Sequence, residues 1–171
     1  MRDVLIVIDM QNDFIDGSLG TPEAQAIIPK VKEKIEKYKE EGKDVIFTKD
    51  THFEDYLDTF EGKNLHVKHC IKGTEGWKIN KELDTNVHAN IIYKRTFGYL
   101  DWNVHINDDE SIEIVGLCTD ICVISNALIL RAWFPNSTIT VDASCCAGVT
   151  PEKHKAALEV MKSCQIEVIN E

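Results

Sequence analysis

The sequence predicts an α/β protein with three layers, α/β/α, around a six-stranded, mainly parallel, doubly wound sheet. Two observations support this fold class. Six short runs rich in Val and Ile recur along the chain, and the stretches between them carry apolar residues at helical spacing. Strands that are apolar on both faces and alternate with helices form a parallel sheet that helices cover on each side.

The expected strands are the apolar runs themselves, which cover residues 3–9, 44–50, 89–95, 111–117, 137–143 and 165–170. Residues 22–42 are expected to form a helix, because Ile28, Val31 and Ile35 follow helical spacing and Gly42 ends the pattern. A second helix is expected over residues 150–164, where Thr150 is the N-cap and Pro151 the first helical residue. The remaining gaps predict helices over 100–106 and 120–133.

Composition limits both the organisation and the partners. The 171 residues are 43% hydrophobic, which is enough for one domain over residues 1–171 with its own core. A net charge of −10 argues against nucleic acid and anionic membranes as partners, since an acidic surface repels both. No stretch approaches the roughly 20 apolar residues of a membrane span, and the N-terminus does not resemble a signal peptide. We therefore expect a cytoplasmic protein with a small-molecule ligand and with its six cysteines as free thiols.

Reactive side chains occur where four of the expected strands end. Asp9 follows the first strand, Asp50 and His52 the second, Lys94 the third, and the sequence "CTDIC" the fourth. Ligands of parallel sheets bind beyond the carboxyl ends of the strands. An acid, a cation and a thiol are thus expected to meet at one edge. The irregular segment 50–76 at this edge is longer than a compact domain usually tolerates without a function.

The "CTDIC" segment suggests a nucleophile. Cys122 lies at the expected start of helix 120–133, where the helix dipole favours the thiolate and lowers the thiol pKa. Unpaired backbone N–H groups at that end, those of Cys118 and Cys122 for example, can hold an oxyanion. Asp9 would take the thiol proton and return it to a leaving amine, while Lys94 keeps Asp9 ionised.

Five blocks of the sequence, "IDMQNDF", "KDTH", "HCIKGTEG", "YKRTF" and "GLCTDICV", resemble the isochorismatase-like cysteine hydrolases, and among them the nicotinamidase (pyrazinamidase) type. The resemblance runs from Met1 to about residue 150. It implies a doubly wound parallel sheet, a catalytic triad at Asp9, Lys94 and Cys122, and a cis peptide bond between Leu117 and Cys118 that turns the oxyanion-hole amides inward.

The same resemblance implies a divalent metal ion, zinc first, with iron or manganese as alternatives. Asp50 and His52 can share one ion because alternate residues of an extended segment point the same way. His69 matches a downstream histidine ligand of the family, and Glu61 lies where some members place a carboxylate. The resemblance also implies that Phe14, Phe97 and His66 form walls of the substrate pocket. His66 stands where the family usually has a large aromatic residue.

These features predict a metal-assisted cysteine amidohydrolase, with nicotinamide hydrolysed to nicotinate and ammonia through a Cys122 thioester as the best single reaction. Within the enzyme class, another small amide, a ureido compound or a vinyl ether is the alternative substrate. A non-catalytic, metal-dependent assembly module and a redox role for Cys118 and Cys122 are the alternatives outside that class. Members of the family commonly form dimers or tetramers, so a homodimer or homotetramer is expected.

Overall fold

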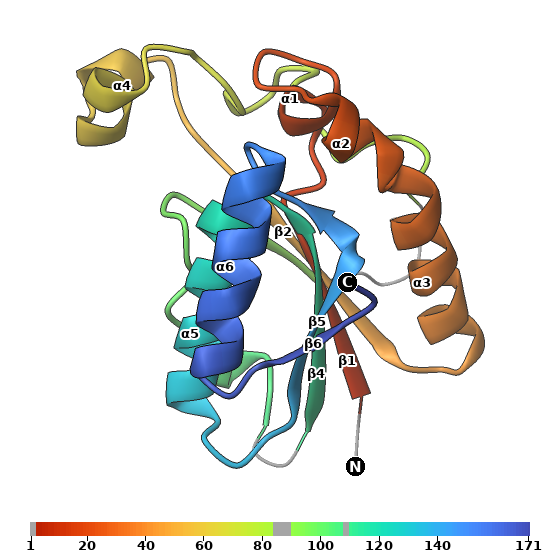
Figure 1. Ribbon diagram of the computed structural model, residues 1–171. Helices are drawn as coiled ribbons and strands as arrows, with labels where there is room; N and C mark the ends of the chain where they lie inside the picture. The colour runs from red at the N-terminus through yellow and green to blue at the C-terminus, as the bar shows by residue number, and fades with distance from the viewer. Residues whose placement is uncertain (1–2, 84–89, 108–109) are drawn as a thin grey trace.

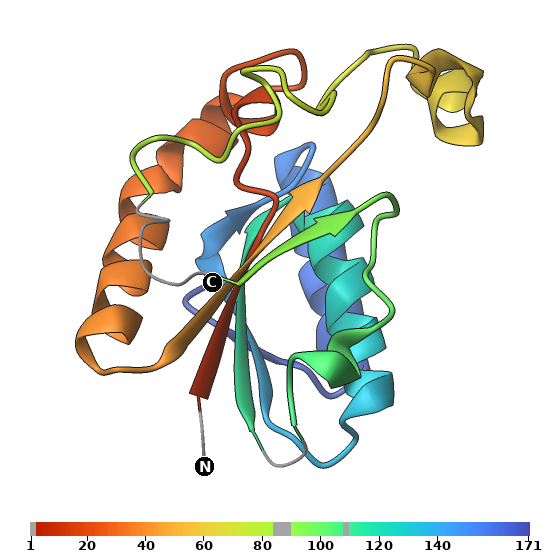
Figure 2. The ribbon, with the colours of Figure 1, turned by 180° about the vertical axis from the view of Figure 1, so that it is seen from behind.

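A single sheet of six strands, in the order β3-β2-β1-β4-β5-β6, forms the centre of the computed structural model, which describes residues 3–83, 90–107 and 110–171 (Figures 1 and 2). The strands are β1 (Asp3–Ile8), β2 (Asp44–Asp50), β3 (Asn90–Lys94), β4 (Ser111–Leu117), β5 (Ile139–Ala147) and β6 (Glu167–Ile169). Every neighbouring pair is parallel. The predicted fold class is confirmed, and the described sheet is wholly parallel rather than mainly so.

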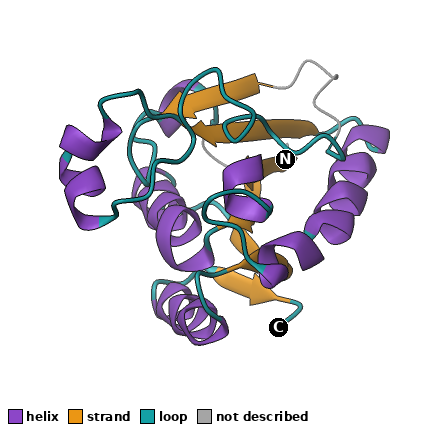
Figure 3. Ribbon diagram, turned by 90° about the horizontal axis from the view of Figure 1, so that it is seen from above, coloured by secondary structure: helices purple, strands orange, loops and turns teal. Residues whose placement is uncertain are grey.

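Helices cover both faces of this sheet. The helices α5 (Ile124–Trp133) and α6 (Pro151–Ser163) lie on one face, and α2 (Pro22–Ala26) and α3 (Ile28–Glu40) lie on the other (Figures 1 and 3). Alternate residues of β1 point into the two layers: Ile6 packs in the core beneath α5 and α6, and Leu5 in the core beneath α3. Both are fully buried, which is why the strands read as continuous apolar runs.

Several boundaries differ from the prediction for identifiable reasons. The helix expected over 22–42 is two helices, because Pro29 has no backbone N–H to continue a helix and instead occupies the first turn of α3. Only a 3₁₀ turn, η2 (Trp102–Val104), forms within 100–106. The strand β5 continues to Ala147, four residues beyond its expected end. Residue 89, the expected start of the third strand, lies outside the described residues.

The irregular segment 50–76 contains two short helices that the sequence pattern did not predict, η1 (Tyr56–Asp58) and α4 (Phe60–Asn64). Thr59 caps α4, since its side chain accepts a hydrogen bond from the N–H of Gly62. In Figure 1 this part of the chain stands away from the sheet, beyond the carboxyl end of β2. The short helix α1 (Asn12–Ile15), also not predicted, follows β1 at the same edge.

Two further expectations concern the chain as a whole. All six cysteines are free thiols, as predicted. Among the described residues, no helix is both long and apolar enough to cross a membrane.

The strand order reverses between β1 and β4, because the chain winds outward from β1 through β2 to β3 and then returns to β4 on the other side. In doubly wound sheets, the crevice at this reversal, beyond the carboxyl ends of the strands, is the usual place for a ligand. Asp9 and the "CTDIC" segment follow the two strands that flank this reversal. The fold therefore brings the predicted acid and the predicted nucleophile to the same crevice.

Candidate active site

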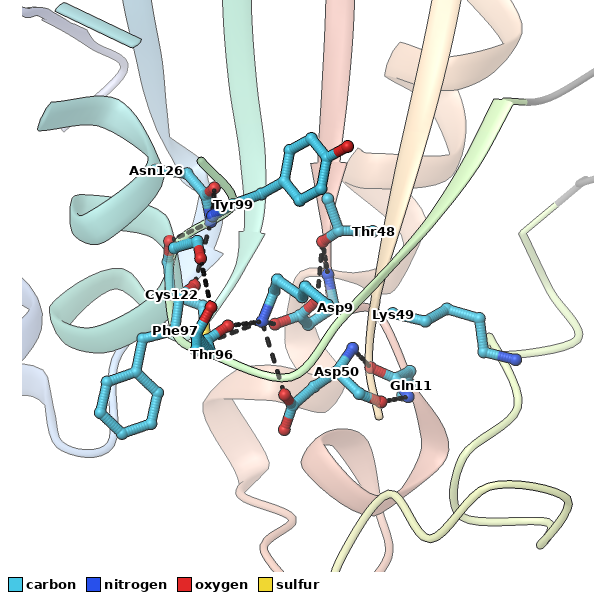
Figure 4. Close-up of polar contacts among 12 residues, drawn as sticks. Asp9, Gln11, Thr48, Lys49, Asp50, Thr96, Phe97, Tyr99, Cys122 and Asn126 are labelled. Atoms are coloured by element: carbon cyan, nitrogen blue, oxygen red, sulfur yellow. Dashed lines mark hydrogen bonds and ion pairs between the residues drawn. The ribbon is translucent and has the colours of Figure 1, made fainter. Parts of the chain in front are cut away.

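Asp9 is held at the end of β1 in an unusual backbone conformation. Its φ angle of 46° lies in the left-handed region, which is rare for residues other than glycine. Its N–H donates to Thr48 Oγ1 at 3.1 Å, and the Thr48 hydroxyl donates to Asp9 Oδ1 at 2.6 Å (Figure 4). The side chain is fully buried, and burial raises the pKa of Asp9 against the opposing effect of Lys94. An aspartate in this setting can accept a proton and hold it.

Lys94, the last residue of β3, connects the charged side chains of the crevice. Its Nζ lies 2.5 Å from Asp9 Oδ2, 3.4 Å from Cys122 Sγ and 3.7 Å from Asp50 Oδ1. Burial lowers the pKa of Lys94, but the adjacent carboxylates outweigh burial and raise it above its ordinary value. The ammonium group therefore stays charged while it contacts both the acid and the thiol.

Cys122 lies in a turn between β4 and α5. One π-helical turn, η3 (Thr119–Val123), precedes α5, and the Leu117–Cys118 peptide bond is cis, as the family resemblance implied. The Cys122 side chain is buried, and burial raises the pKa of its thiol well above the ordinary value, although Lys94 lowers it. The expectation of a lowered thiol pKa is therefore wrong in this structure, since the cost of burying a thiolate exceeds what the helix end and Lys94 offset. The resting side chain is the neutral thiol.

Gly116, two residues before Cys118, has a backbone conformation and a close contact that only glycine accommodates without strain. Gly116 has a φ of 118°, and a Cβ atom there would lie 2.1 Å from the carbonyl oxygen of Ile8. The close approach brings β4 against β1 immediately before the cysteine segment, where the β4–β5 register also shifts. The carbonyl oxygen of Cys118 accepts from the N–H groups of Ile121 and Val123. Cys118 is the N-cap of η3 and Cys122 lies in this first turn, where N–H groups commonly lack an intrahelical partner, so these two amides are the candidates for an oxyanion.

Side chains that the sequence analysis missed hold this turn in place. The buried Asn126 Nδ2 donates to the carbonyl oxygens of Cys122 (2.8 Å) and Phe97 (3.1 Å), and its Oδ1 accepts from Tyr99 N (2.9 Å) and Trp102 Nε1 (3.1 Å) (Figure 4). All of the hydrogen-bonding capacity of this amide is used. Asparagine is uncommon at buried positions. Its presence within the helical pattern was the one signal for this role in the sequence.

The same turn is joined by one polar contact to the loop before α6 and by another to α6 itself. Asp120 Oδ1 accepts the N–H of Val149 at 2.9 Å, and Thr119 Oγ1 lies 2.7 Å from His154 Nδ1. Burial lowers the pKa of His154, which favours the neutral imidazole, and the Nδ1 of that ring can accept a hydrogen bond from the Thr119 hydroxyl or donate one to it. The cysteine segment is therefore fixed by the helix that follows it and by the next helix along the chain.

A second cluster lies beside the first. One potential ligand atom from each of Asp50, His52, Glu61 and His69 lies within 4.8 Å of all the others. Asp50 Oδ2 is 2.9 Å from His52 Nε2 and 3.5 Å from His69 Nε2, and Glu61 Oε1 is 3.5 Å from both rings. Burial lowers the pKa of His69, but hydrogen bonds to Asp50 and Glu61 raise it to about 10. Two imidazoles facing two carboxylates fit a divalent first-row metal ion.

Neighbouring groups orient these four side chains. His69 Nδ1 lies 2.8 Å from the carbonyl oxygen of Val67, which leaves Nε2 facing the cluster. The Tyr56 ring packs edge-on against His52 and His69, with ring centroids 4.7 and 5.0 Å away. Tyr56 itself is fully buried and donates to the carbonyl oxygen of Leu65 at 3.0 Å. The imidazoles are therefore held by hydrogen bonding and packing together.

A cavity of about 750 Å³ contacts both clusters, a volume typical of small-molecule sites. Its lining includes both predicted aromatic walls, Phe14 and Phe97, and the Phe14 ring lies 5.5 Å from that of His69. Two cations, Arg95 and Lys153, also line it and were not predicted. His66 is exposed and is not among the described lining residues, although its exposed neighbours Asn64 and Leu65 are. The structure thus places two of the three predicted pocket residues in the wall.

The sheet and the buried acid, lysine and cysteine define a doubly wound α/β protein of the cysteine hydrolase class. The Isochorismatase domain family matches residues 3–171, so the chain belongs to the isochorismatase family of hydrolases. It is 30% identical to the nicotinamidase/pyrazinamidase of Mycobacterium tuberculosis, over 96% of this chain and 97% of that protein. A probable inactive nicotinamidase of Arabidopsis thaliana is 31% identical, over 93% of this chain and 87% of that one.

Solved structures show the same relationship. The pyrazinamidase of Pyrococcus horikoshii in complex with zinc superposes with a TM-score of 0.86 at 29% identity, and the match covers 100% of both chains. The nicotinamidase/pyrazinamidase of Bacillus subtilis superposes with a TM-score of 0.84 at 26% identity, over 99% of this chain and 100% of that one. The fold and the family therefore agree along the whole chain.

Proposed function

We propose that this protein is a metal-assisted cysteine amidohydrolase and that nicotinamide, hydrolysed to nicotinate and ammonia, is its best single substrate. The observation that carries the proposal is the position of Lys94 Nζ, 2.5 Å from the Asp9 carboxylate and 3.4 Å from Cys122 Sγ. A buried thiol, a buried acid and a charged lysine in mutual contact beside a ligand-sized cavity are the parts that acyl transfer through a thioester needs.

In the first half of the reaction, Asp9 accepts the Cys122 thiol proton while the sulfur attacks the carbonyl carbon of the amide. The new C–S bond places negative charge on the carbonyl oxygen, and the N–H groups of Cys118 and Cys122, at the start of η3, are the proposed donors to it. Asp9 then gives its proton to the amide nitrogen. The C–N bond breaks, ammonia leaves, and the acyl group remains on Cys122 as a thioester.

In the second half, Asp9 acts as a base toward water. The water oxygen attacks the thioester carbon, the C–S bond breaks, and the proton held by Asp9 returns to the Cys122 sulfur as the carboxylic acid leaves. Lys94 stays protonated throughout and offsets the negative charge that passes between Asp9 and Cys122. Because the resting nucleophile is a thiol, proton transfer to Asp9 accompanies the attack.

Asp50, His52, Glu61 and His69 would hold the metal ion, with zinc proposed first and iron or manganese as alternatives. When bound, the ion supplies a Lewis-acid position for a nitrogen or oxygen donor of the substrate or for water. The zinc complex of the P. horikoshii pyrazinamidase supports this assignment. A metal-binding cluster favours an amide over a vinyl ether, since the resemblance associates the vinyl ether reaction with metal-free members.

The substrate itself is open to test. The M. tuberculosis and B. subtilis relatives support nicotinamide. The position of His66 outside the wall and the two cations lining the cavity keep another small amide or a ureido compound as the second candidate. A non-catalytic assembly module is the third candidate function, which the likeness to a probable inactive nicotinamidase supports. One domain over residues 1–171 and a homodimer or homotetramer remain parts of this proposal, and light scattering measures the latter.

The test is ammonia release from nicotinamide by purified protein, before and after chelation and with zinc, iron or manganese added back. We expect release that chelation abolishes and metal restores, and a loss of at least about 10³-fold in Cys122→Ala. Cys146→Ala is the matched control, because this second buried cysteine lies on β5 and does not line the cavity. Full turnover by Cys122→Ala would refute the mechanism. Ammonia release from a panel of ureido compounds and amides, but not from nicotinamide, would change the substrate alone.

A further inference from the structure

Gln11 is a fully buried residue of the "IDMQNDF" block that takes no part in the proposed reaction. Its Oε1 accepts the N–H of Asp50 at 2.7 Å, and its Nε2 donates to the carbonyl oxygen of Asp50 at 2.9 Å (Figure 4). The side-chain amide thus pairs with both backbone polar groups of one residue. This is the pairing that a neighbouring β-strand would otherwise provide.

The backbone around Asp50 explains why such a pairing is needed. Pairing between β1 and β2 ends at Val7 and Phe47, three residues before Asp50, because the chain turns at Asp9. On its other side, Asp50 still pairs with Lys94 of β3. Gln11 therefore replaces the missing strand on one side, and a backbone that is buried would otherwise leave a donor and an acceptor unpaired.

A third hydrogen bond of the same amide reaches the segment that carries His69. Gln11 Nε2 also donates to the carbonyl oxygen of Trp77, at 2.9 Å. Trp77 is fixed in turn, since its Nε1 donates to Thr51 Oγ1 at 2.9 Å and its ring stacks on Tyr93 with centroids 5.7 Å apart. One side chain therefore contacts the strand end that presents Asp50 and the segment that follows His69.

That segment is also paired directly with the strand end. The N–H of His52 donates to the carbonyl oxygen of Cys70 at 3.0 Å, and the N–H of Lys72 donates to the carbonyl oxygen of His52 at 2.9 Å. The pairing sets His52 opposite Ile71, two residues after His69. Gln11 lies on the opposite side of Asp50 from β3, so Asp50 is paired on both sides, by Lys94 and by Gln11.

We infer that Gln11 is a positioning residue for the metal cluster, which fixes Asp50 relative to the segment carrying His69. The inference rests on the proposed function, because it concerns the metal site of that proposal. Gln11 contacts no proposed ligand atom, only the backbone that carries the ligands. Groups that orient metal ligands typically change metal affinity by about 10- to 100-fold when they are replaced.

The test measures zinc affinity by competition with a chromophoric chelator, in the full chain. Gln11→Met keeps the length of the side chain and removes all three hydrogen bonds, and Gln25→Met, on the exposed surface of α2, is the matched control. We expect the zinc dissociation constant of Gln11→Met to rise about 10- to 100-fold and that of Gln25→Met to stay unchanged. At saturating zinc, ammonia release by Gln11→Met should return to within about threefold of wild type, because the cysteine and its partners are intact.

A second variant covers a failure of Gln11→Met to fold, which circular dichroism in chelator would reveal. Gln11→Glu keeps the acceptor for the Asp50 N–H but sets an oxygen against two carbonyl oxygens. Its added negative charge would by itself favour a cation, so weaker zinc binding by this variant supports positioning. A folded Gln11 variant that binds zinc within about threefold of wild type overturns the inference, as does failure of both variants to fold. If the wild-type chain binds no zinc, the metal site of the proposed function fails as well.

Discussion

Replacing Asn126 by leucine removes the four hydrogen bonds that join α5, the cysteine turn and the loop after β3, while it keeps a side chain of similar size. Two of the partners, the Cys122 carbonyl and Trp102 Nε1, belong to buried residues and cannot turn to water. The other two, at Phe97 and Tyr99, belong to an exposed and a half-buried residue, which water can reach. A buried polar group left unpaired costs about 1 to 3 kcal/mol, so the two buried groups together predict a loss of about 2 to 6 kcal/mol.

That loss is a large part of the 5 to 15 kcal/mol or so that stabilises an ordinary domain. Urea unfolding followed by circular dichroism measures it, and the midpoint should fall at an unchanged slope. Asn64→Leu is the control, because the side chain of Asn64 donates to the Phe60 carbonyl at the exposed surface of α4, where water can replace this hydrogen bond. A destabilisation of Asn126→Leu below about 1 kcal/mol would refute the reasoning, since it would mean that the buried partners find other acceptors and donors.

Two further predictions concern the stability of the fold. Gly116→Ala should lower the free energy of unfolding by about 3 kcal/mol or more, because the residue has a φ of 118° and its Cβ would meet the Ile8 carbonyl. Gly42→Ala is the control and should cost about 1 kcal/mol, because Gly42 has a φ of 67° and open space around it. Equal urea midpoints for the two variants would contradict this prediction. Burial raises the pKa of Asp142, but hydrogen bonds from Lys34 and Ser144 outweigh burial and hold it below its ordinary value. A carboxyl group whose pKa is lowered by folding stabilises the protein above its ordinary pKa, and this stabilisation is lost as the pH falls through the pKa of the folded state. Asp142→Asn should therefore be less stable than wild type at neutral pH, and the difference should shrink as the pH falls below about 4. Thermal unfolding across that pH range measures the difference, and a difference independent of pH would count against the ion pair.

The sequence predicted the sheet well because its central strands are apolar on both faces and four of the strand ends carry a distinctive polar residue or the cysteine turn. The four strand-end groups, at Asp9, Asp50, Lys94 and the cysteine turn, do meet in the structure. Topology alone requires that meeting, since parallel strands end at one edge. The predicted metal ligands also lie together, although Glu61 comes from a short helix that no periodicity indicated.

Features that depend on three-dimensional surroundings could not be predicted in this way. The predicted direction of the Cys122 pKa shift was wrong. The sequence reveals the nearby helix end, which lowers the pKa, but it does not reveal the burial that outweighs this effect, because burial arises from packing. Gln11 and Asn126 each bond groups that are distant in sequence, 66 residues away for Gln11 and Trp77 and 29 for Asn126 and Phe97, so no local pattern reveals these contacts. His66 was predicted in the pocket from its spacing to His69, whereas in the structure its exposed neighbours Asn64 and Leu65 line the cavity and His66 is not among the described lining residues.

Asp50 belongs to both clusters, because its Oδ1 lies 3.7 Å from Lys94 Nζ while its Oδ2 faces the two imidazoles. The two clusters are consequently not separable modules, and a substitution at Asp50 cannot remove one while it spares the other. Effects of paired substitutions at Asp50 and Lys94 should be non-additive for the same reason. A redesign that aims at a different metal preference has its freedom at Glu61, the most exposed of the four side chains at 23%, because Glu61 is in contact with the imidazoles and not with Lys94.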